Sequence, residues 1–348
     1  MPETRALQQK LADKVWHTLF GGGESAMLSP WRLRDKKQDH HAIRAAELSA
    51  IQTMLDELDD LHAGRRIFNH HGEIVAAADA QLLASIRFNP LIERVADDPL
   101  SALNVPGTAE ALRDVRLEAD ILALRHSLNV RRIGLRADIL VETFALETLS
   151  PRPVDADWLL RWKESAARAV ATDFQDMWAR VLVDEVRQPG THSLRTLAFL
   201  ATLSRAEMSA IRFMTAVDLG GFICPDAPDY FHPDIHGPMF LQMEAMGLLL
   251  PGLDTILLKT VADRGFRAVL RCQNKALFIE GIGSELVIGA HVLTSLGREV
   301  NALFNGLADT AYLFALGNAL KKRGFTIEIG DWHGQADGSG LFSEKMRL

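Results

Sequence analysis

Two histidines and an aspartate in the last third of the chain have a spacing that could hold a metal ion. His232 and His236 are four residues apart with Asp234 between them, and imidazole nitrogens and carboxylate oxygens are common zinc ligands. Pro233 and Pro238 interrupt this stretch, so we expect an irregular loop in place of a helix. We therefore predict ordinary loop histidines, and we keep a metal-dependent hydrolase that uses these residues as an alternative.

Two residues of opposite charge lie on either side of an expected turn, and we expect them to have a structural role. Glu185 follows Val181 and Leu182 on the apolar face of an expected helix, and Arg195 follows the turn at 189–190. A carboxylate on a buried face needs a partner, because an unpaired charge is costly to bury. We predict that Glu185 and Arg195 form a structural ion pair that joins two antiparallel helices.

The sequence lacks the motifs of common nucleotide and acyl-transfer sites. It contains no G-x-x-x-x-G-K-[ST] phosphate loop and no G-x-S-x-G nucleophile elbow. Its two cysteines, Cys224 and Cys272, are too few for a disulfide framework and suit a reducing compartment. We expect a non-catalytic protein that uses no cofactor.

The elements that would position these residues are mainly helical. Apolar residues recur at helical spacing between 108 and 221, with Pro-Gly and Gly-Gly stops. Thr172 and Ser204 are each followed three residues later by Gln or Glu, the pattern of a capping box that begins a helix. The apolar faces also carry three tryptophans that we expect in the core, namely Trp158, Trp162 and Trp178.

The N-terminal segment has the composition of an arm that meets a surface. Residues 5–20 form an amphipathic helix, a glycine run at 21–23 ends it, and a basic cluster follows. This composition is typical of a segment on an anionic membrane, yet a helix docked on the protein or on a second copy has the same pattern. The expected membrane or partner contacts are Trp16, Leu19, Phe20, Leu28, Trp31, Arg32, Arg34, Lys36 and Lys37.

The last part of the chain mixes helices with short strands. Residues 266–272, 276–280 and 285–288 alternate or run apolar like strands, and helical patterns flank them, an order that resembles a winged helix. The sequence thus predicts a mainly α protein, with a central helical bundle and a smaller C-terminal α+β unit of winged-helix type. We expect an amphipathic arm and long helix at 1–64, a connecting segment at 65–107, the bundle at 108–221, the α+β unit at 222–330 and a flexible tail at 331–348.

The net charge of −7 is unevenly distributed. Residues 1–44 hold eight Lys/Arg and five Asp/Glu, whereas residues 204–348 hold 13 Lys/Arg and 16 Asp/Glu. An acidic surface repels phosphates, so we expect no nucleic-acid partner. No apolar run reaches the ~20 residues of a membrane span, and no secretory signal begins the chain. We expect a cytoplasmic protein, with peripheral contact with the anionic inner membrane left open.

Three stretches between 151 and 204 form a dense pattern. They read V-D-x-D-W-L-x-R-W at 154–162, Q-x-x-W-A-x-V-L-x-x-E-V at 175–186 and P-G-x-x-S-L-R-T-L at 189–197. This pattern resembles the signature of a bacterial domain family of unknown function that is loosely similar to abortive-infection and phage-defence proteins. The resemblance implies a helical fold and a role in antiviral defence, and it brings no catalytic residues with it.

We therefore expect a non-catalytic interaction or effector component of a bacterial anti-phage system. It would act through a protein partner encoded nearby or through membrane contact of the N-terminal arm, and a homo-oligomer is left open. A DNA-binding transcriptional regulator that uses the winged-helix-like unit is the first alternative. The metal-dependent hydrolase is the second.

Overall fold

The computed structural model describes residues 2–21, 40–63, 65–68, 74–76, 108–144, 148–259, 265–304, 306–334 and 340–348. The chain divides into two compact units, Met1–Thr191 and His192–Leu348. Helices dominate the first unit, and the second combines helices with antiparallel sheets. The protein is therefore mainly α with an α+β part at its C-terminal end, while the central bundle and the winged helix stay predictions.

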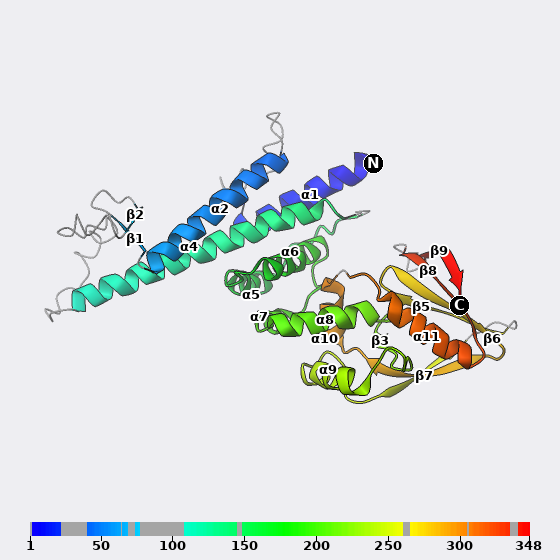
Figure 1. The fold of residues 1–348 in the computed structure, drawn as a ribbon. Coiled ribbons are helices and arrows are strands. Elements are labelled where there is room, and N and C mark those ends of the chain that lie inside the picture. The colour runs from blue at the N-terminus through cyan, green and yellow to red at the C-terminus, as the bar shows by residue number, and fades with distance from the viewer. Residues whose placement is uncertain are drawn as a thin grey trace. The chain divides into compact units, whose positions relative to one another are not determined.

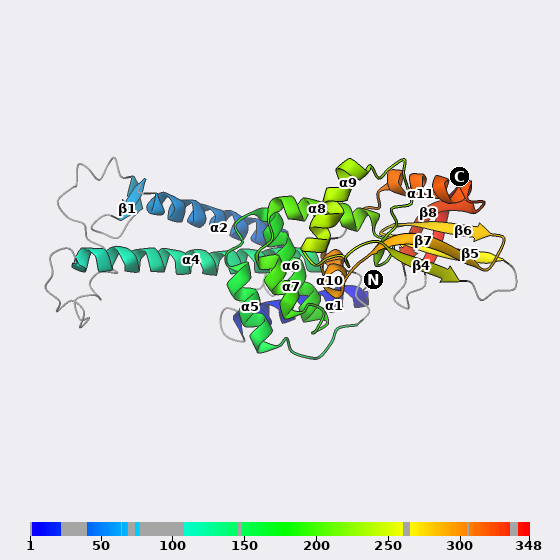
Figure 2. The ribbon, with the colours of Figure 1, turned by 90° about the horizontal axis from the view of Figure 1, so that it is seen from below.

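The first unit is built around two long helices. α2 (His40–His62) and α4 (Thr108–Val141) lie side by side (Figures 1 and 2). Ion pairs link Arg131 to Glu47 and Arg125 to Asp59, so the two helices run antiparallel. A short hairpin of β1 (Arg66–Phe68) and β2 (Ile74–Ala76) follows α2. Most of the connecting segment expected at 65–107 lies outside the described residues.

Three further helices pack against α4. They are α1 (Pro2–Phe20), α5 (Ala156–Ala166) and α6 (Thr172–Arg187). Trp16 of α1 packs in a cluster with Ile51 of α2 and Leu135 of α4, so one core joins three helices. Trp162 and Trp178 are buried as predicted, and the indole N–H of Trp162 donates to the carbonyl oxygen of Trp178 at 3.2 Å. The buried indole is thereby satisfied, as an interior tryptophan requires.

The two expected capping boxes have different outcomes. Ser204 accepts the backbone N–H of Glu207 at 3.3 Å, and the Glu207 carboxylate accepts the N–H of Ser204 at 2.8 Å, which confirms this box. The box predicted at Thr172 is wrong, because α6 begins there without a side-chain cap. Gln175 instead lies on the buried face of α6 and donates to the carbonyl oxygen of Ala169 at 2.9 Å.

The second unit contains two antiparallel sheets and five helices within its described residues. The sheet order is β3-β7-β4 in one and β5-β6-β8-β9 in the other. The strands are β3 (Phe222–Ile223), β4 (Asp254–Lys259), β5 (Phe266–Cys272), β6 (Lys275–Gly281), β7 (Glu285–Val292), β8 (Thr326–Gly334) and β9 (Gly340–Arg347). The helices are α7 (Leu194–Ala201), α8 (Arg205–Val217), α9 (Pro233–Ala245), α10 (Ser295–Leu303) and α11 (Thr310–Lys322).

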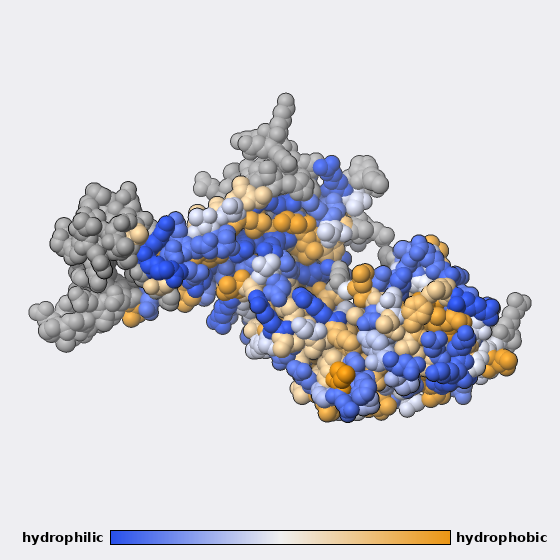
Figure 3. Space-filling model, viewed as in Figure 1, coloured by the Kyte–Doolittle hydropathy of each residue, from blue (hydrophilic) through white to orange (hydrophobic). Residues whose placement is uncertain are grey.

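One helix covers one face of the four-stranded sheet. α11 lies along this sheet (Figures 1 and 2), and a Cβ added at Gly317 would meet Ile327 of β8 and Leu277 of β6. The residues under α11 are fully buried, as Leu277, Ile279 and Ile327 show. Figure 3 shows the side of the second unit that carries α11, where hydrophilic and hydrophobic residues are interspersed.

Two sequence expectations for this unit need correction. Residues 232–236 were expected in an irregular loop, but α9 begins at Pro233, because proline is tolerated at the first helical position. Pro238 lies inside the same helix. Residues 331–348 were expected as a flexible tail, but 331–334 complete β8 and 340–347 form β9, which pairs with it. The glycine content of this stretch hid the strand pattern.

Candidate functional site

The predicted N-terminal arm is only partly within the described residues. Trp16 and Leu19 are 1% and 3% exposed, and Phe20 packs beside Trp16 with ring centroids 5.1 Å apart. The docked alternative is therefore the arrangement that the structure shows for α1, and membrane contact by Trp16 would need α1 to leave its core. The other predicted contacts lie outside the described residues: Leu28, Trp31, Arg32, Arg34, Lys36 and Lys37.

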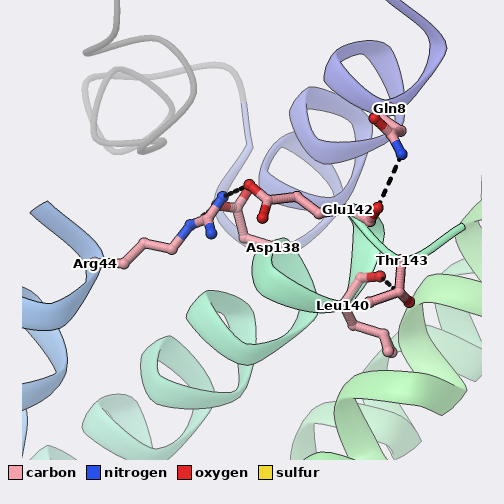
Figure 4. Close-up of polar contacts among 6 residues, drawn as sticks. All are labelled: Gln8, Arg44, Asp138, Leu140, Glu142 and Thr143. Atoms are coloured by element: carbon pink, nitrogen blue, oxygen red, sulfur yellow. Dashed lines mark hydrogen bonds and ion pairs between the residues drawn. The ribbon is translucent and has the colours of Figure 1, made fainter. Parts of the chain in front are cut away.

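Polar contacts also fix α1 to the first unit. Lys14 Nζ donates to the carbonyl oxygens of Ser150, Arg152 and Val186, at 2.9, 2.8 and 2.8 Å. Burial lowers the pKa of Lys14, since removing water disfavours the charged ammonium. Gln8 donates to two carbonyl oxygens just after α4, each at 3.0 Å, and Figure 4 shows one of these bonds.

A buried ion pair joins α2 to α4 beside these contacts (Figure 4). Arg44 Nε lies 2.6 Å from Asp138 Oδ2, and the second nitrogen Nη2 lies 2.7 Å from Glu142 Oε1. Burial raises the pKa of Asp138 to about 6, and the Arg44 guanidinium acts in the opposite direction. The Trp16 indole also lowers the pKa of Asp138, although it makes no hydrogen bond of ordinary geometry. These groups hold α2 and α4 together.

The predicted pair of Glu185 and Arg195 spans the two units. Glu185 is 2% exposed, and its Oε1 accepts the backbone N–H of Gly190 at 2.6 Å. This bond closes the turn after α6, where Gly190 has a φ of +95° that favours glycine. Arg195 is exposed and belongs to the second unit. The ion pair stays a prediction, and a turn-closing hydrogen bond is the role that the described contacts give to Glu185.

The candidate metal ligands lie near one another without converging. His232 Nδ1 is 3.8 Å from Asp234 Oδ2, and both side chains are well exposed. His236 uses Nδ1 to accept the N–H of His232 at 3.0 Å, and its ring stacks against Phe213 and Tyr230. Among the residues that the structure describes, no group of three or more His, Cys, Asp or Glu is placed to hold a metal ion.

The described parts of the chain also bear on thiol chemistry and on membrane-spanning helices. Cys224 and Cys272 are buried, and burial raises the pKa of each thiol to about 12, which disfavours the reactive thiolate. None of the helices in the described ranges is both long enough and apolar enough to cross a membrane.

The uncovered face of the four-stranded sheet carries a different set of side chains. Strand register places Arg267, Val269 and Arg271 of β5 on this face, opposite Glu280, Phe278 and Ala276 of β6. β8 and β9 add Glu328, Gly330, Trp332, Phe342 and Arg347. We call this set, with Lys345, the open sheet face. Val269 is 40% exposed there, whereas Leu270 next to it on the α11 side is 4% exposed, as period-two alternation requires.

Three half-buried aromatic rings form the centre of the open sheet face. Phe278 and Phe342 have ring centroids 6.3 Å apart. Phe342 lies over Gly330, where an added Cβ would come within 2.7 Å of its ring. Trp332 pairs directly with Phe342 across β8 and β9. The absence of a side chain at Gly330 therefore leaves room for the Phe342 ring to pack against the sheet.

Basic side chains lie over and around these rings. The Arg271 guanidinium carbon is 5.7 Å from the centroid of a Trp332 ring, and Lys345 Nζ is 5.2 Å from that of Phe342. Both distances suit cation–π attraction. Four basic residues stand on the face against two acidic ones, and Glu280 is paired with Arg267 at 2.9 Å. The local charge is thus positive in a chain whose net charge is −7.

Sequence reasoning missed this surface. The alternation of Arg267, Val269 and Arg271 with buried neighbours was visible in the strand at 266–272. Trp332 and Phe342 were assigned to a tail, so their place beside Phe278 was not expected. The signal that could have found them is two aromatic residues on either side of a glycine-rich turn, a pattern that favours a hairpin.

Comparison with known proteins agrees with part of the resemblance. Residues 128–223 match the family model described as "Protein of unknown function (DUF2806)". The match contains residues 151–204 and runs from α4 to β3, so this segment is similar to a family of unknown function. No curated protein matches the chain. No solved structure matches it. The open sheet face lies outside the matched segment.

Proposed function

We propose that this protein is a non-catalytic interaction component and that the open sheet face is its binding surface. The observation that supports this proposal is the gathering of three aromatic rings and four basic side chains on a sheet face that no helix of the described second unit covers. Exposed aromatic and arginine side chains are enriched at binding surfaces, because they offer large contact areas and directional bonds.

Three titratable groups elsewhere in the described residues have structural roles. Asp138 is paired with Arg44 inside the helical unit, and Glu185 closes a turn. Cys272 donates to the backbone carbonyl of Ala216 at 3.1 Å from a buried position. A binding role therefore accounts for the arrangement of side chains better than a catalytic one.

The biological context that we propose is a bacterial anti-phage system. The pattern at 151–204 supports it through its resemblance to defence proteins. Cells that carry the gene and its neighbours should plate phage less efficiently than cells without them. A variant with Arg271→Glu and Lys345→Glu should lose this protection, and equal plating on all strains would contradict the defence role.

The binding surface itself is tested by cross-linking in cells. The full chain, the Arg271→Glu/Lys345→Glu variant and a control variant, Lys321→Glu/Lys322→Glu, are cross-linked and purified under denaturing conditions. The control makes the same charge change on α11, which covers the other face of the sheet. We expect cross-linked material to be recovered with the wild type and with the control variant, and much less of it with the Arg271→Glu/Lys345→Glu variant. Equal recovery from all three would remove the open sheet face as the binding surface.

A further inference from the structure

We propose that the open sheet face binds single-stranded nucleic acid. Bases would stack on Phe278, Trp332 and Phe342, and phosphates would lie next to Arg271 and Lys345. This inference rests on the proposed function, because it names the occupant of the same surface. It also revises the expectation from net charge, since charge on one face is not the average over the chain.

The arrangement of the rings favours stacking with unpaired bases. Proteins that bind single strands present aromatic rings on an open antiparallel sheet, and successive bases stack on them because every base has a π-face. Phe278, Trp332 and Phe342 come from three neighbouring strands of one sheet. The Phe342 ring packs against Gly330 and the Trp332 ring against Gly340, so these side chains are already held in place and lose little entropy on binding.

The cations on this face have the chemistry to meet a phosphate backbone. Arg271 is exposed and lies over a Trp332 ring, so the guanidinium can both stack with a base and donate to a phosphate. Lys345 is exposed beside Phe342. Arg347 pairs with Glu328 in the β8–β9 register, at the other end of the face. The cations thus lie next to the aromatic rings, where they could contact the phosphates of a strand whose bases stack on those rings.

Other occupants fit this face less well. A duplex is read by a helix or ribbon that enters the major groove, whereas the open sheet face is made of side chains from four paired strands. A protein interface usually has an apolar core. Among the described residues of this face, Val269 is an exposed aliphatic side chain, and the basic residues next to it suit an anionic partner better than an apolar one.

The expected affinity is modest and depends on salt. The basic residues are few, and Arg267 is engaged with Glu280. Non-specific nucleic-acid binding gives Kd values of roughly 10⁻⁶–10⁻⁴ M, and its logarithm changes with the logarithm of salt by about 0.7 per phosphate contact for single strands. We expect the open sheet face to bind in this range.

The test is fluorescence anisotropy with the purified full chain and labelled oligonucleotides of about 16 nucleotides, the upper end of site sizes for one single-strand-binding fold. The probes are oligo(U), oligo(dT) and a duplex of equal length, titrated between about 50 and 200 mM salt. We expect at least one single strand to bind more tightly than the duplex. Comparison of oligo(U) with oligo(dT) identifies RNA or DNA as the preferred ligand.

Matched variants locate the binding. Phe342→Ala and Trp332→Ala should each weaken single-strand binding by about 5- to 150-fold, the effect of removing one stacking ring. Leu341→Ala is the control, because Leu341 is exposed on the same strand and points to the other side of the sheet. Arg271→Gln should reduce the salt dependence by about 0.7, whereas Lys322→Gln on α11 should leave it unchanged. If an aromatic variant unfolds, the exposed Arg271→Gln and Lys345→Gln variants still decide the question.

Two results would overturn this inference. One is the absence of single-strand binding at about 50 mM salt, and the other is equal binding of single strand and duplex that the face variants do not change. If cross-linking then recovers a protein that only the face variant loses, the binding surface stands and its occupant is a protein. If cross-linking also shows no difference, the proposed function falls with the inference.

Discussion

Arg44 and Asp138 form an ion pair inside the first unit, with Nε 2.6 Å from Oδ2 and side chains that are 3% and 0% exposed. The pair connects α2 to α4 across more than ninety residues of chain. Charged groups at such depth are costly, so the pair persists only while both partners keep this geometry. We infer that it fixes how far the two long helices slide along each other.

Replacing one partner of this pair should destabilise the first unit strongly. Arg44→Met leaves the Asp138 carboxylate buried without its main partner, so we expect the free energy of unfolding to fall by about 3–5 kcal/mol at pH 7. The double variant Arg44→Met/Asp138→Leu removes both charges and should recover most of the loss. Urea unfolding of the three proteins measures this, and equal instability of the single and double variants would show that packing, not charge, is responsible.

The same carboxyl should make stability depend on pH. The folded-state pKa of Asp138 is about 6 and the ordinary value is 3.8, so the folded protein holds this proton more tightly than the unfolded chain. The resulting stabilisation is complete below about pH 4 and is lost as the pH rises through 6, a change on the order of 3 kcal/mol. The advantage of wild type over Asp138→Asn in the free energy of unfolding should therefore shrink or change sign as the pH rises between these values. Urea unfolding of both proteins across this range measures it. Parallel curves would contradict this assignment.

The docking of α1 should depend on Lys14. Lys14→Met leaves the carbonyl oxygens of Ser150, Arg152 and Val186 without their donor, which we expect to cost about 1–3 kcal/mol. Hydrogen exchange of the α1 amides should accelerate in this variant. Lys10→Met is the control, because Lys10 is an exposed residue of the same helix. Unchanged exchange in Lys14→Met would mean that the apolar face alone holds α1.

The helices of the first unit could be predicted because their apolar residues repeat at helical spacing. Trp162 and Trp178 were expected in the core and are buried there. The role of α1 was not fixed by its sequence, since the same amphipathic pattern suits a membrane surface, a partner or the protein's own core. Trp16 and Lys14 place α1 against the protein's own core, and they do so through contacts with residues far away in the chain.

The candidate site was harder to predict for a physical reason. Its residues come from four strands, and strand register, which the sequence does not reveal, decides which side chains share a face. Arg271 and Trp332 are sixty-one positions apart, yet the guanidinium lies over the ring. The net charge of −7 also pointed away from a nucleic-acid partner, because an average over the whole chain does not show that one face is locally basic.

The aromatic centre of the open sheet face should depend on Gly330. An added Cβ would lie 2.5 Å from the carbonyl oxygen of Ser343 and 2.7 Å from the Phe342 ring, so β9 or the ring would have to move. We expect Gly330→Ala to lower the free energy of unfolding by about 1–3 kcal/mol, as overpacking does, and to change the near-ultraviolet circular dichroism, to which Trp332 and Phe342 contribute. Gly237→Ala is the control, because an added Cβ meets nothing within 4 Å in α9 and should stabilise by about 0.5–1 kcal/mol. A stable Gly330→Ala protein with unaltered near-ultraviolet circular dichroism would show that Phe342 does not rest on this glycine.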